Sequence, residues 1–154
     1  MSIEKARAHL ARHGLEERIQ EFTVSSATVA LAAEALGCEP ARIAKSLSFE
    51  KGDSAILVIA AGDARIDNAK FKQRFGMKAK MLSAEKVEPL IGHGVGGVCP
   101  FGVKDGVPVY LDESLKRFET VYPAAGTPSS AVHLSLEELE RASECEGWVD
   151  VCKQ

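Results

Sequence analysis

The sequence predicts an α+β or mixed α/β fold, because helix and strand signals are mixed along the chain without the regular alternation of a Rossmann fold. Residues 43–50 and 55–61 are typical of two strands, and Lys51-Gly52-Asp53 between them predicts the turn of a hairpin. The second of these runs is continuously apolar, which predicts a strand in the middle of the sheet. Helix caps and stops surround this hairpin in sequence. We therefore expect one mixed sheet with helices packed around it.

The remaining elements follow from caps, stops and periodicity. Gly14, Gly37 and Gly76 are natural helix ends, and Ser135 with Glu138 has the spacing of a capping box. We expect helices at residues 3–13, from Ser25 or Ser26 to 36, and at 67–75, 84–91, 113–118 and 136–143. We expect further strands at residues 18–23, 79–82, 107–111, 120–124, 131–134 and 148–151.

Length and composition are those of a globular protein. The chain has 154 residues, of which 45% are hydrophobic and 27% charged, and we expect residues 1–154 to form a single domain. The longest apolar stretch, residues 54–61, is too short for a membrane span, and the first residues lack a secretory signal, so we expect a cytoplasmic protein. The cysteines, Cys38, Cys99, Cys145 and Cys152, match no zinc spacing and are expected to be free thiols. No metal or cofactor pattern is visible.

Charge is distributed unevenly although the net charge is only −3, which argues against a general nucleic-acid coat protein. Residues 64–82 carry six basic side chains and one acid, whereas residues 134–150 carry six acids and one arginine. Two interpretations remain open. The segments form two solvated faces, or the basic segment steers a phosphate-bearing ligand to one side of the molecule.

A glycine-rich segment from Gly92 to Gly106 holds six of the thirteen glycines. Glycine permits positive φ and lets backbone N–H groups approach a ligand, so this segment predicts a site for a phosphate or a developing oxyanion. The alternative is a mobile surface loop. Val95, Val98 and Phe101 favour the rigid interpretation, because such apolar side chains could fix the loop to the core. The pattern is neither a dinucleotide fingerprint nor a P-loop.

Lys45 is the second candidate site residue. On a strand it shares a face with Ile43, Leu47 and Phe49, where an ammonium group needs an anionic partner unless it reaches water at the edge. Both alternatives remain open from the residues alone.

Two further features could join this site. Cys99 and His93 suggest a thiol nucleophile, but no acid or amide obviously orients the histidine, so we expect Cys99 to be a small loop residue. The segment Gly126-Thr127-Pro128-Ser129-Ser130 is either a plain turn or a second polar wall of the same pocket.

Three motifs together resemble the YbaK/prolyl-tRNA-synthetase-associated editing-domain family. They are residues 43–47 (Ile-Ala-Lys-Ser-Leu), residues 96–102 (Gly-Gly-Val-Cys-Pro-Phe-Gly) and residues 125–128 (Ala-Gly-Thr-Pro), and the resemblance runs from about Phe22 to Val151. The family's GxxxP loop corresponds to residues 96–100, and its lysine corresponds to Lys45. The fold implied by this resemblance is a mixed, largely antiparallel and barrel-like sheet surrounded by helices.

The resemblance implies a freestanding deacylase that uses no metal or cofactor. Such a protein hydrolyses the ester between a small wrong amino acid, such as alanine, serine or cysteine, and the end of tRNA(Pro) or a related tRNA. Its partners would be the aminoacyl-tRNA acceptor end and an aminoacyl-tRNA synthetase. Lys45 would hold the terminal nucleotide, the loop N–H groups would form the oxyanion hole, and the substrate's ribose hydroxyl would assist water. The implied catalytic set is Lys45, Gly96, Gly97, Val98, Cys99 and Pro100, and the implied substrate-binding set is Thr28, His93, Phe101, Gly126, Thr127 and Ser129.

Ser129 departs from the asparagine or histidine that many relatives carry after Gly-Thr-Pro, so the sequence leaves the recognised amino acid open. Two other functions also remain open. One is a binding module that associates with tRNA or a synthetase without hydrolysis, and the other is a thiol hydrolase that uses Cys99.

Overall fold

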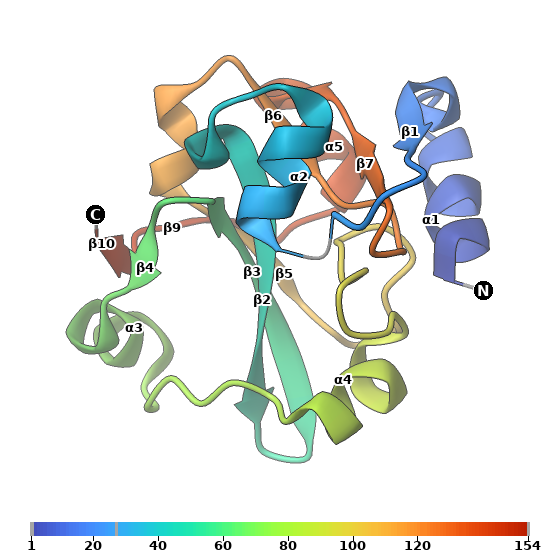
Figure 1. The fold of residues 1–154 in the computed structure, drawn as a ribbon. Coiled ribbons are helices and arrows are strands. Elements are labelled where there is room, and N and C mark those ends of the chain that lie inside the picture. The colour runs from blue at the N-terminus through green and yellow to red at the C-terminus, as the bar shows by residue number, and fades with distance from the viewer. Residues whose placement is uncertain (1, 27, 154) are drawn as a thin grey trace.

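The computed structural model describes residues 2–26 and 28–153. Its centre is a six-stranded sheet in the order β8-β6-β2-β3-β5-β9. The long hairpin of β2 and β3 runs through the middle of the molecule (Figure 1). The strands of this sheet are β2 (Ile43–Lys51), β3 (Ser54–Ala61), β5 (Val109–Asp112), β6 (Thr120–Pro123), β8 (Leu134–Ser135) and β9 (Gly147–Val149).

Strand directions in this sheet are mixed, as the sequence predicts. β2 pairs with β3 and β6 with β8 in antiparallel fashion, whereas β2–β6, β3–β5 and β5–β9 are parallel. Residues 55–61 of β3 are fully buried, which explains their continuously apolar sequence. Two small antiparallel pairs complete the strands: β1 (Ile19–Glu21) with β7 (Ser130–Val132), and β4 (Arg65–Ile66) with β10 (Cys152–Lys153).

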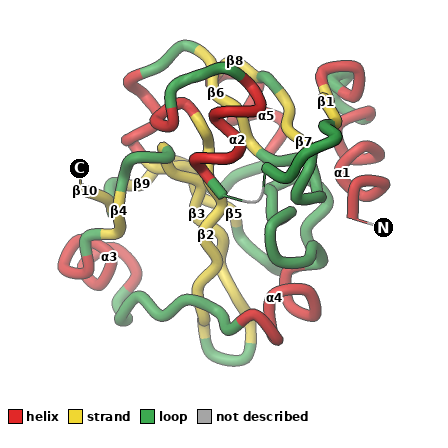
Figure 2. Tube along the Cα trace, in the orientation of Figure 1, coloured by secondary structure: helices red, strands yellow, loops and turns green. Residues whose placement is uncertain are grey.

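Helices cover the outside of the strands (Figure 2). Three of them end at glycines in the left-handed conformation, Gly37, Gly76 and Gly92, where a side chain would be strained. The predicted capping box of Ser135 and Glu138 is present. The α-helices are α1 (Ser2–Ala11), α2 (Val29–Leu36), α3 (Asn68–Phe75), α4 (Ala84–Ile91) and α5 (Leu136–Ser143), and short 3-10 helices lie at Glu16–Arg18, Pro40–Arg42 and Glu113–Arg117.

Several element boundaries differ from the expectations. The cap of α2 is Thr28, whose side chain accepts a hydrogen bond from the Leu31 N–H, so the helix begins later than Ser25 or Ser26 predicted. Residues 79–82 form a single bridge, Phe49 to Met81, instead of a strand. The strand expected at 131–134 is divided between β7 and β8, which pair with different strands, and the strand expected at 148–151 ends at Val149.

The segment that follows β3 is held by an aromatic cluster on one face of the hairpin. Phe49 of β2 packs against Phe71 of α3 with ring centroids 4.7 Å apart, and Phe71 packs in turn against Phe75 at the same distance. Phe49 and Phe71 are fully buried. This packing fixes α3 and the chain after it beside the lower half of the hairpin (Figure 1). Among the described residues, no helix is long and apolar enough to cross a membrane.

Candidate functional site

A cavity of about 340 Å³ lies between α2, β2, the start of α4 and the glycine-rich loop. Its walls come from five parts of the chain, and most of the side chains are small: Ala32, Ala44, Ala84, Ala124 and Ala131 contribute only methyl groups. Lys45, Gly96, Val98 and Thr28, all predicted site residues, line it. The volume is at the lower end of the range for small-molecule sites, and the small walls leave room for a ligand against the sheet.

Lys45 of β2 lines this cavity, and its ammonium group donates hydrogen bonds to backbone oxygens. Its Nζ donates to the carbonyl of Gly62 at 3.3 Å and to the carbonyl of Ala64. Burial lowers the pKa of this lysine below its usual value, with Cys152 and Asp63 opposing the shift. An ammonium group has three donors, and two are used here, so one remains for a ligand. Neither alternative from the sequence, an anion or open water, describes this arrangement fully.

The glycine loop enters the cavity through a tight turn. The N–H of Gly97 donates to the carbonyl of Gly94 at 3.0 Å, and Gly96 has a φ of 89°, which is the geometry of a type II turn with glycine at its third position. The Gly97 N–H is therefore not available to a ligand, and Pro100 has none. Within the described part of the chain, the N–H groups of Gly96 and Val98 donate to no backbone carbonyl, and both residues line the cavity.

The loop and the turn at residues 126–130 lie in direct contact. A Cβ on Gly97 would come within 2.5 Å of the carbonyl of Gly126 and 2.7 Å of the Thr127 nitrogen, so only glycine fits there. The Ser130 hydroxyl braces the turn, because it donates to the Thr127 carbonyl at 3.2 Å and accepts from the Thr127 hydroxyl at 3.0 Å. Gly126, Thr127 and Ser129 do not line the cavity, whereas Ser130 does. The turn supports the glycine loop and shapes one wall through Ser130.

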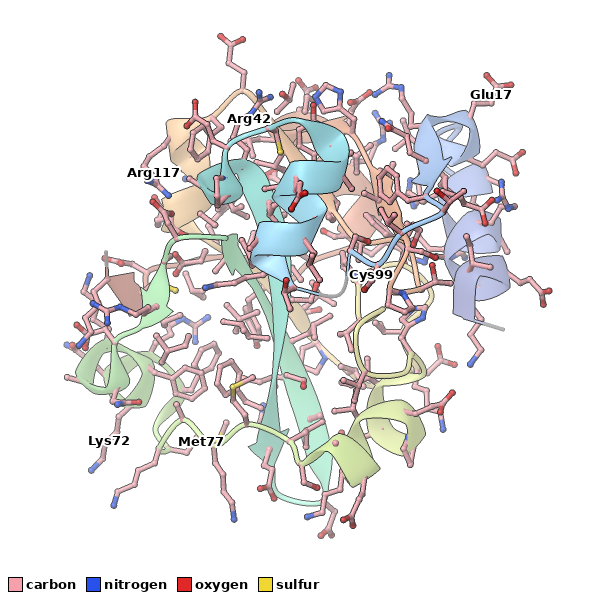
Figure 3. All side chains as sticks on the ribbon, viewed as in Figure 1. Glu17, Arg42, Lys72, Met77, Cys99 and Arg117 are labelled. Atoms are coloured by element: carbon pink, nitrogen blue, oxygen red, sulfur yellow. The ribbon has the colours of Figure 1, made fainter. Side chains whose placement is uncertain are left out.

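Cys99, His93 and Phe101 are fully buried and lie outside the cavity lining, and Cys99 and Phe101 belong to the hydrophobic core. Figure 3 labels Cys99 on the glycine-rich loop. Nε2 of His93 lies 2.6 Å from the Phe101 carbonyl, which can only accept, so this nitrogen carries the proton and cannot take one from the thiol 3.6 Å away. Burial raises the pKa of Cys99 to about 12. The pair is not an activated nucleophile.

The base of the loop is anchored to α1. Lys5 Nζ donates to the Gly92 carbonyl at 3.0 Å, and the Gly102 N–H donates to Nδ1 of His9 at 2.9 Å. Of the side chains expected to fix the loop, Phe101 is buried and Val98 half-buried, but Val95 is 64% exposed at the mouth of the cavity. These contacts favour a rigid loop over the mobile alternative.

One cluster has the composition of a metal site. His9, His13 and Glu144 offer ligand atoms within 4.8 Å of one another. However, Nδ1 of His9 accepts the Gly102 N–H, which leaves the proton on Nε2, and Nε2 lies 2.6 Å from the Ala142 carbonyl. The Arg12 guanidinium also lies 3.5 Å from Glu144. These side chains therefore form hydrogen bonds that connect α1 with α5, and they do not fit a metal cation.

The sequence interpretation missed Ser46 and Ser48, which line the cavity beside Lys45. The Oγ of Ser46 is buried without a hydrogen-bond partner in the described structure. Residues two apart on a strand lie on the same face, so the spacing of Ser46 and Ser48 was the signal that the sequence offered. Lys45, placed among apolar residues of the other face, gave a stronger signal.

Comparison with known proteins places this geometry in a family. The family model for the aminoacyl-tRNA editing domain matches residues 23–142. The uncharacterized protein YwhH of Bacillus subtilis is 52% identical over 99% of this chain and 98% of its own length. A proline–tRNA ligase of Shouchella clausii is 34% identical over 79% of this chain, and the match spans only 21% of that ligase.

Solved structures agree with this placement. A crystal structure described as that of a candidate trans-editing enzyme for prolyl tRNA synthetase superposes with a TM-score of 0.88 at 30% identity, covering 99% of this chain and 98% of that one. The family resemblance and the fold expected from the three motifs are therefore confirmed. The chain belongs to the aminoacyl-tRNA editing domain family.

Proposed function

We propose that this protein acts in trans on mischarged tRNA, hydrolysing the ester that joins a small non-cognate amino acid to the terminal adenosine. The substrate would be alanine, serine or cysteine on tRNA(Pro) or a related tRNA. One observation carries the proposal: Lys45 and the glycine turn, far apart in sequence, line one cavity whose walls are mostly small side chains. The family membership and the likeness to a candidate trans-editing enzyme support it.

The groups around the cavity suggest how hydrolysis proceeds. The free donor of Lys45 binds the phosphate or sugar of the terminal nucleotide. The N–H groups of Gly96 and Val98 stabilise the negative charge that develops on the carbonyl oxygen of the ester when water attacks. Among its described lining residues the cavity has no histidine, cysteine or carboxylate that could act as a base. Water is therefore activated with help from the ribose hydroxyl of the substrate, and no metal takes part in the proposed step.

Selectivity would come from the size of the cavity. The methyl walls admit a small side chain and exclude a larger cognate residue by steric clash. Exclusion is the stronger device, because one missing methylene changes the free energy of binding by only about 1–3 kcal/mol.

The test uses tRNA(Pro) charged separately with alanine, serine, cysteine and proline, with release of each amino acid followed in time. We expect release of at least one small residue and no release of proline. Lys45→Ala abolishes release while the circular dichroism spectrum is retained. Lys51→Ala is the matched control, because Lys51 lies on the same strand with its side chain in solvent. Full activity of Lys45→Ala would contradict the proposal, and stable tRNA binding without release would favour the non-catalytic binding module.

A further inference from the structure

The side of β2 that faces away from β3 has a short stretch of backbone with no pairing strand. This open edge faces the cavity. Ala44 pairs with Pro123 of β6. Because proline has no N–H, that pairing uses the N–H and carbonyl of Ala44, which must therefore point away from β3. Further along, the Ser48 carbonyl accepts from the Leu82 N–H at 3.1 Å, and the Glu50 N–H donates to the Lys80 carbonyl at 2.8 Å. Residues 44, 48 and 50 thus direct their backbone polar groups to the outer edge.

Ser46 lies between these two contacts and must point the same way, since backbone direction alternates along a strand. The β6 ladder stops at Ala44, and the contact with residues 80–82 begins at Ser48. Within the described structure the backbone N–H and carbonyl of Ser46 have no protein partner. Ser46 is half-buried, but its Oγ is fully buried. The atoms of Ser46 that are exposed to the cavity are therefore its backbone and Cβ. Unpaired backbone groups at a buried edge favour a polar ligand or water there.

Three of the other hydroxyl groups that line the cavity are already engaged. Ser130 braces the neighbouring turn, the Thr28 hydroxyl caps α2, and the Ser26 hydroxyl donates to the Pro128 carbonyl at 3.2 Å. The covered hydroxyl of Ser46 has no partner. A buried hydroxyl without a hydrogen bond is unfavourable, and rotation about its χ1 can turn the oxygen toward a ligand.

Charge decides which ligand group fits the opening. No carboxylate lies among the described lining residues, so a cationic group in the cavity must be bound by neutral oxygens. Lys45 is adjacent in sequence, but its side chain leaves the strand on the opposite face and its ammonium group is held by Gly62 and Ala64. Ser46 therefore offers two acceptors, its carbonyl and its hydroxyl, at a place turned away from that cation.

We propose that Ser46 binds the α-ammonium group of the aminoacyl substrate through its backbone carbonyl and its hydroxyl. This inference rests on the proposed function. It makes the open edge of β2 the element that distinguishes an amino acid ester from an ordinary carboxylic ester. With the ammonium group at Ser46, the ester carbonyl is left for the N–H groups of the glycine turn.

The experiment compares two esters of the same tRNA terminus, alanyl and propionyl, which differ only in the ammonium group. Each is given to the wild-type protein and to Ser46→Ala. We expect kcat/KM for the alanyl ester to fall about tenfold in the variant, the size of one charge-assisted hydrogen bond, with the propionyl ester unchanged. Comparing the two proteins on one ester at a time cancels the different intrinsic labilities of the esters.

The midpoint of thermal unfolding distinguishes the proposal from a purely structural role of Ser46, because loss of a structural serine would lower the midpoint. Ser46→Ala removes an unpaired buried hydroxyl, so its unfolding midpoint should equal or exceed that of the wild type. Ser143→Ala is the matched control: this buried serine lies in α5, and its hydroxyl donates to the Glu140 carbonyl. That variant should lower the midpoint and leave both esters unaffected.

Equal decreases in kcat/KM on the two esters, or no decrease on either, would overturn the role of Ser46, and so would a lowered midpoint without selectivity between them. Each of these outcomes still requires that the wild type hydrolyses the alanyl ester. Failure of the wild type on every aminoacyl ester would instead overturn the proposed function.

Discussion

At the scale of single residues, the glycine loop is constrained by contacts that differ from one glycine to the next. Gly96 needs its positive φ for the turn, whereas Gly97 needs the absence of a Cβ against Gly126. Gly94 needs neither, because the nearest atom to its Cβ would be 3.9 Å away. Loop glycines that look alike in the sequence are therefore not equivalent in the structure.

Gly97→Ala should separate the loop from the turn at 126–127. The added methyl lies far inside van der Waals distance of backbone atoms that cannot move aside easily, so we expect a decrease of about 1–3 kcal/mol in the free energy of unfolding and a large decrease in ester hydrolysis. Denaturant titration and single-turnover hydrolysis measure the two effects. Gly94→Ala in the same loop should change little. Similar behaviour of the two variants would show that the close approach of Gly97 to Gly126 is unimportant.

Buried histidines make stability depend on pH. Burial lowers the pKa values of His93 and His9 below the ordinary value of about 6.5, so the unfolded chain binds protons at these sites before the folded one does. Their neutral forms stabilise the fold above about pH 6.5, and this contribution decreases as the pH falls further. Urea unfolding between about pH 8 and pH 5 should show the decrease, with a smaller slope in His93→Gln. An identical slope in that variant would remove His93 from the explanation.

At the scale of elements, the start of α2 carries both a cap and a wall of the cavity. Thr28 accepts the Leu31 N–H at 3.1 Å and lines the cavity, and Val29 and Ala32 of the helix lie beside it. We therefore expect any contribution of Thr28 to substrate binding to act through the position of the helix as well as through its side chain. A short helix of eight residues depends strongly on such a cap.

Thr28→Ala should lower the free energy of unfolding by about 0.5–2 kcal/mol and raise KM, because the first turn of α2 loses a hydrogen-bond partner. Thr28→Ser, which retains the hydroxyl, should restore most of both properties. Steady-state kinetics and denaturant titration distinguish the cases. A serine variant as impaired as the alanine variant would indicate that the methyl group, not the cap, is what matters.

At the scale of the whole molecule, the basic segment at residues 64–82 is partly neutralised by acidic side chains from other parts of the chain. Several of the basic side chains are engaged: Lys70 with Asp150, Lys80 with Glu50, and Arg74 over the rings of Phe75 and Tyr110. Lys72 and Lys78 remain without an ion pair in the described structure and line a second surface hollow with Asn68. Lys72 projects outward from α3 (Figure 3). Lys78 lies close in sequence to Met81 at the cavity, within a span of at most about 11 Å.

We expect the charge reversals Lys72→Glu and Lys78→Glu to weaken binding of intact tRNA and to leave hydrolysis of a minimal aminoacyl-adenosine ester unchanged. Removal of each phosphate interaction should reduce the slope of log affinity against log salt by about one. Arg141→Glu, an exposed reversal on the acidic helix α5, is the control and should leave the slope unaltered. If all three variants behave alike, the basic segment forms only a solvated face.

Local features of this protein could be predicted from the order of its residues. The β2–β3 hairpin, the glycine stops at Gly37 and Gly76 and the capping box at Ser135 depend on a few neighbouring residues, so their patterns could be recognised directly. The three motifs also identified the family, because each consists of contiguous residues. Periodicity could not decide the exact cap of α2 or the fate of residues 79–82, where distant pairing overrides local propensity.

The construction of the site, in contrast, depends on how distant segments pack. Whether His93 and Cys99 face a ligand or the core depends on α1, whose His9 packs against Phe101 and accepts the Gly102 N–H although it precedes the loop by more than eighty residues. The hydrogen-bond partners of Lys45 lie in the chain after β3. Ser46 is unpaired because the pairing of β2 with β6 ends at Ala44 and the contact of β2 with residues 80–82 begins only at Ser48. Hydrogen-bond satisfaction and burial are properties of the folded assembly of segments, and no local pattern records which backbone groups remain unpaired.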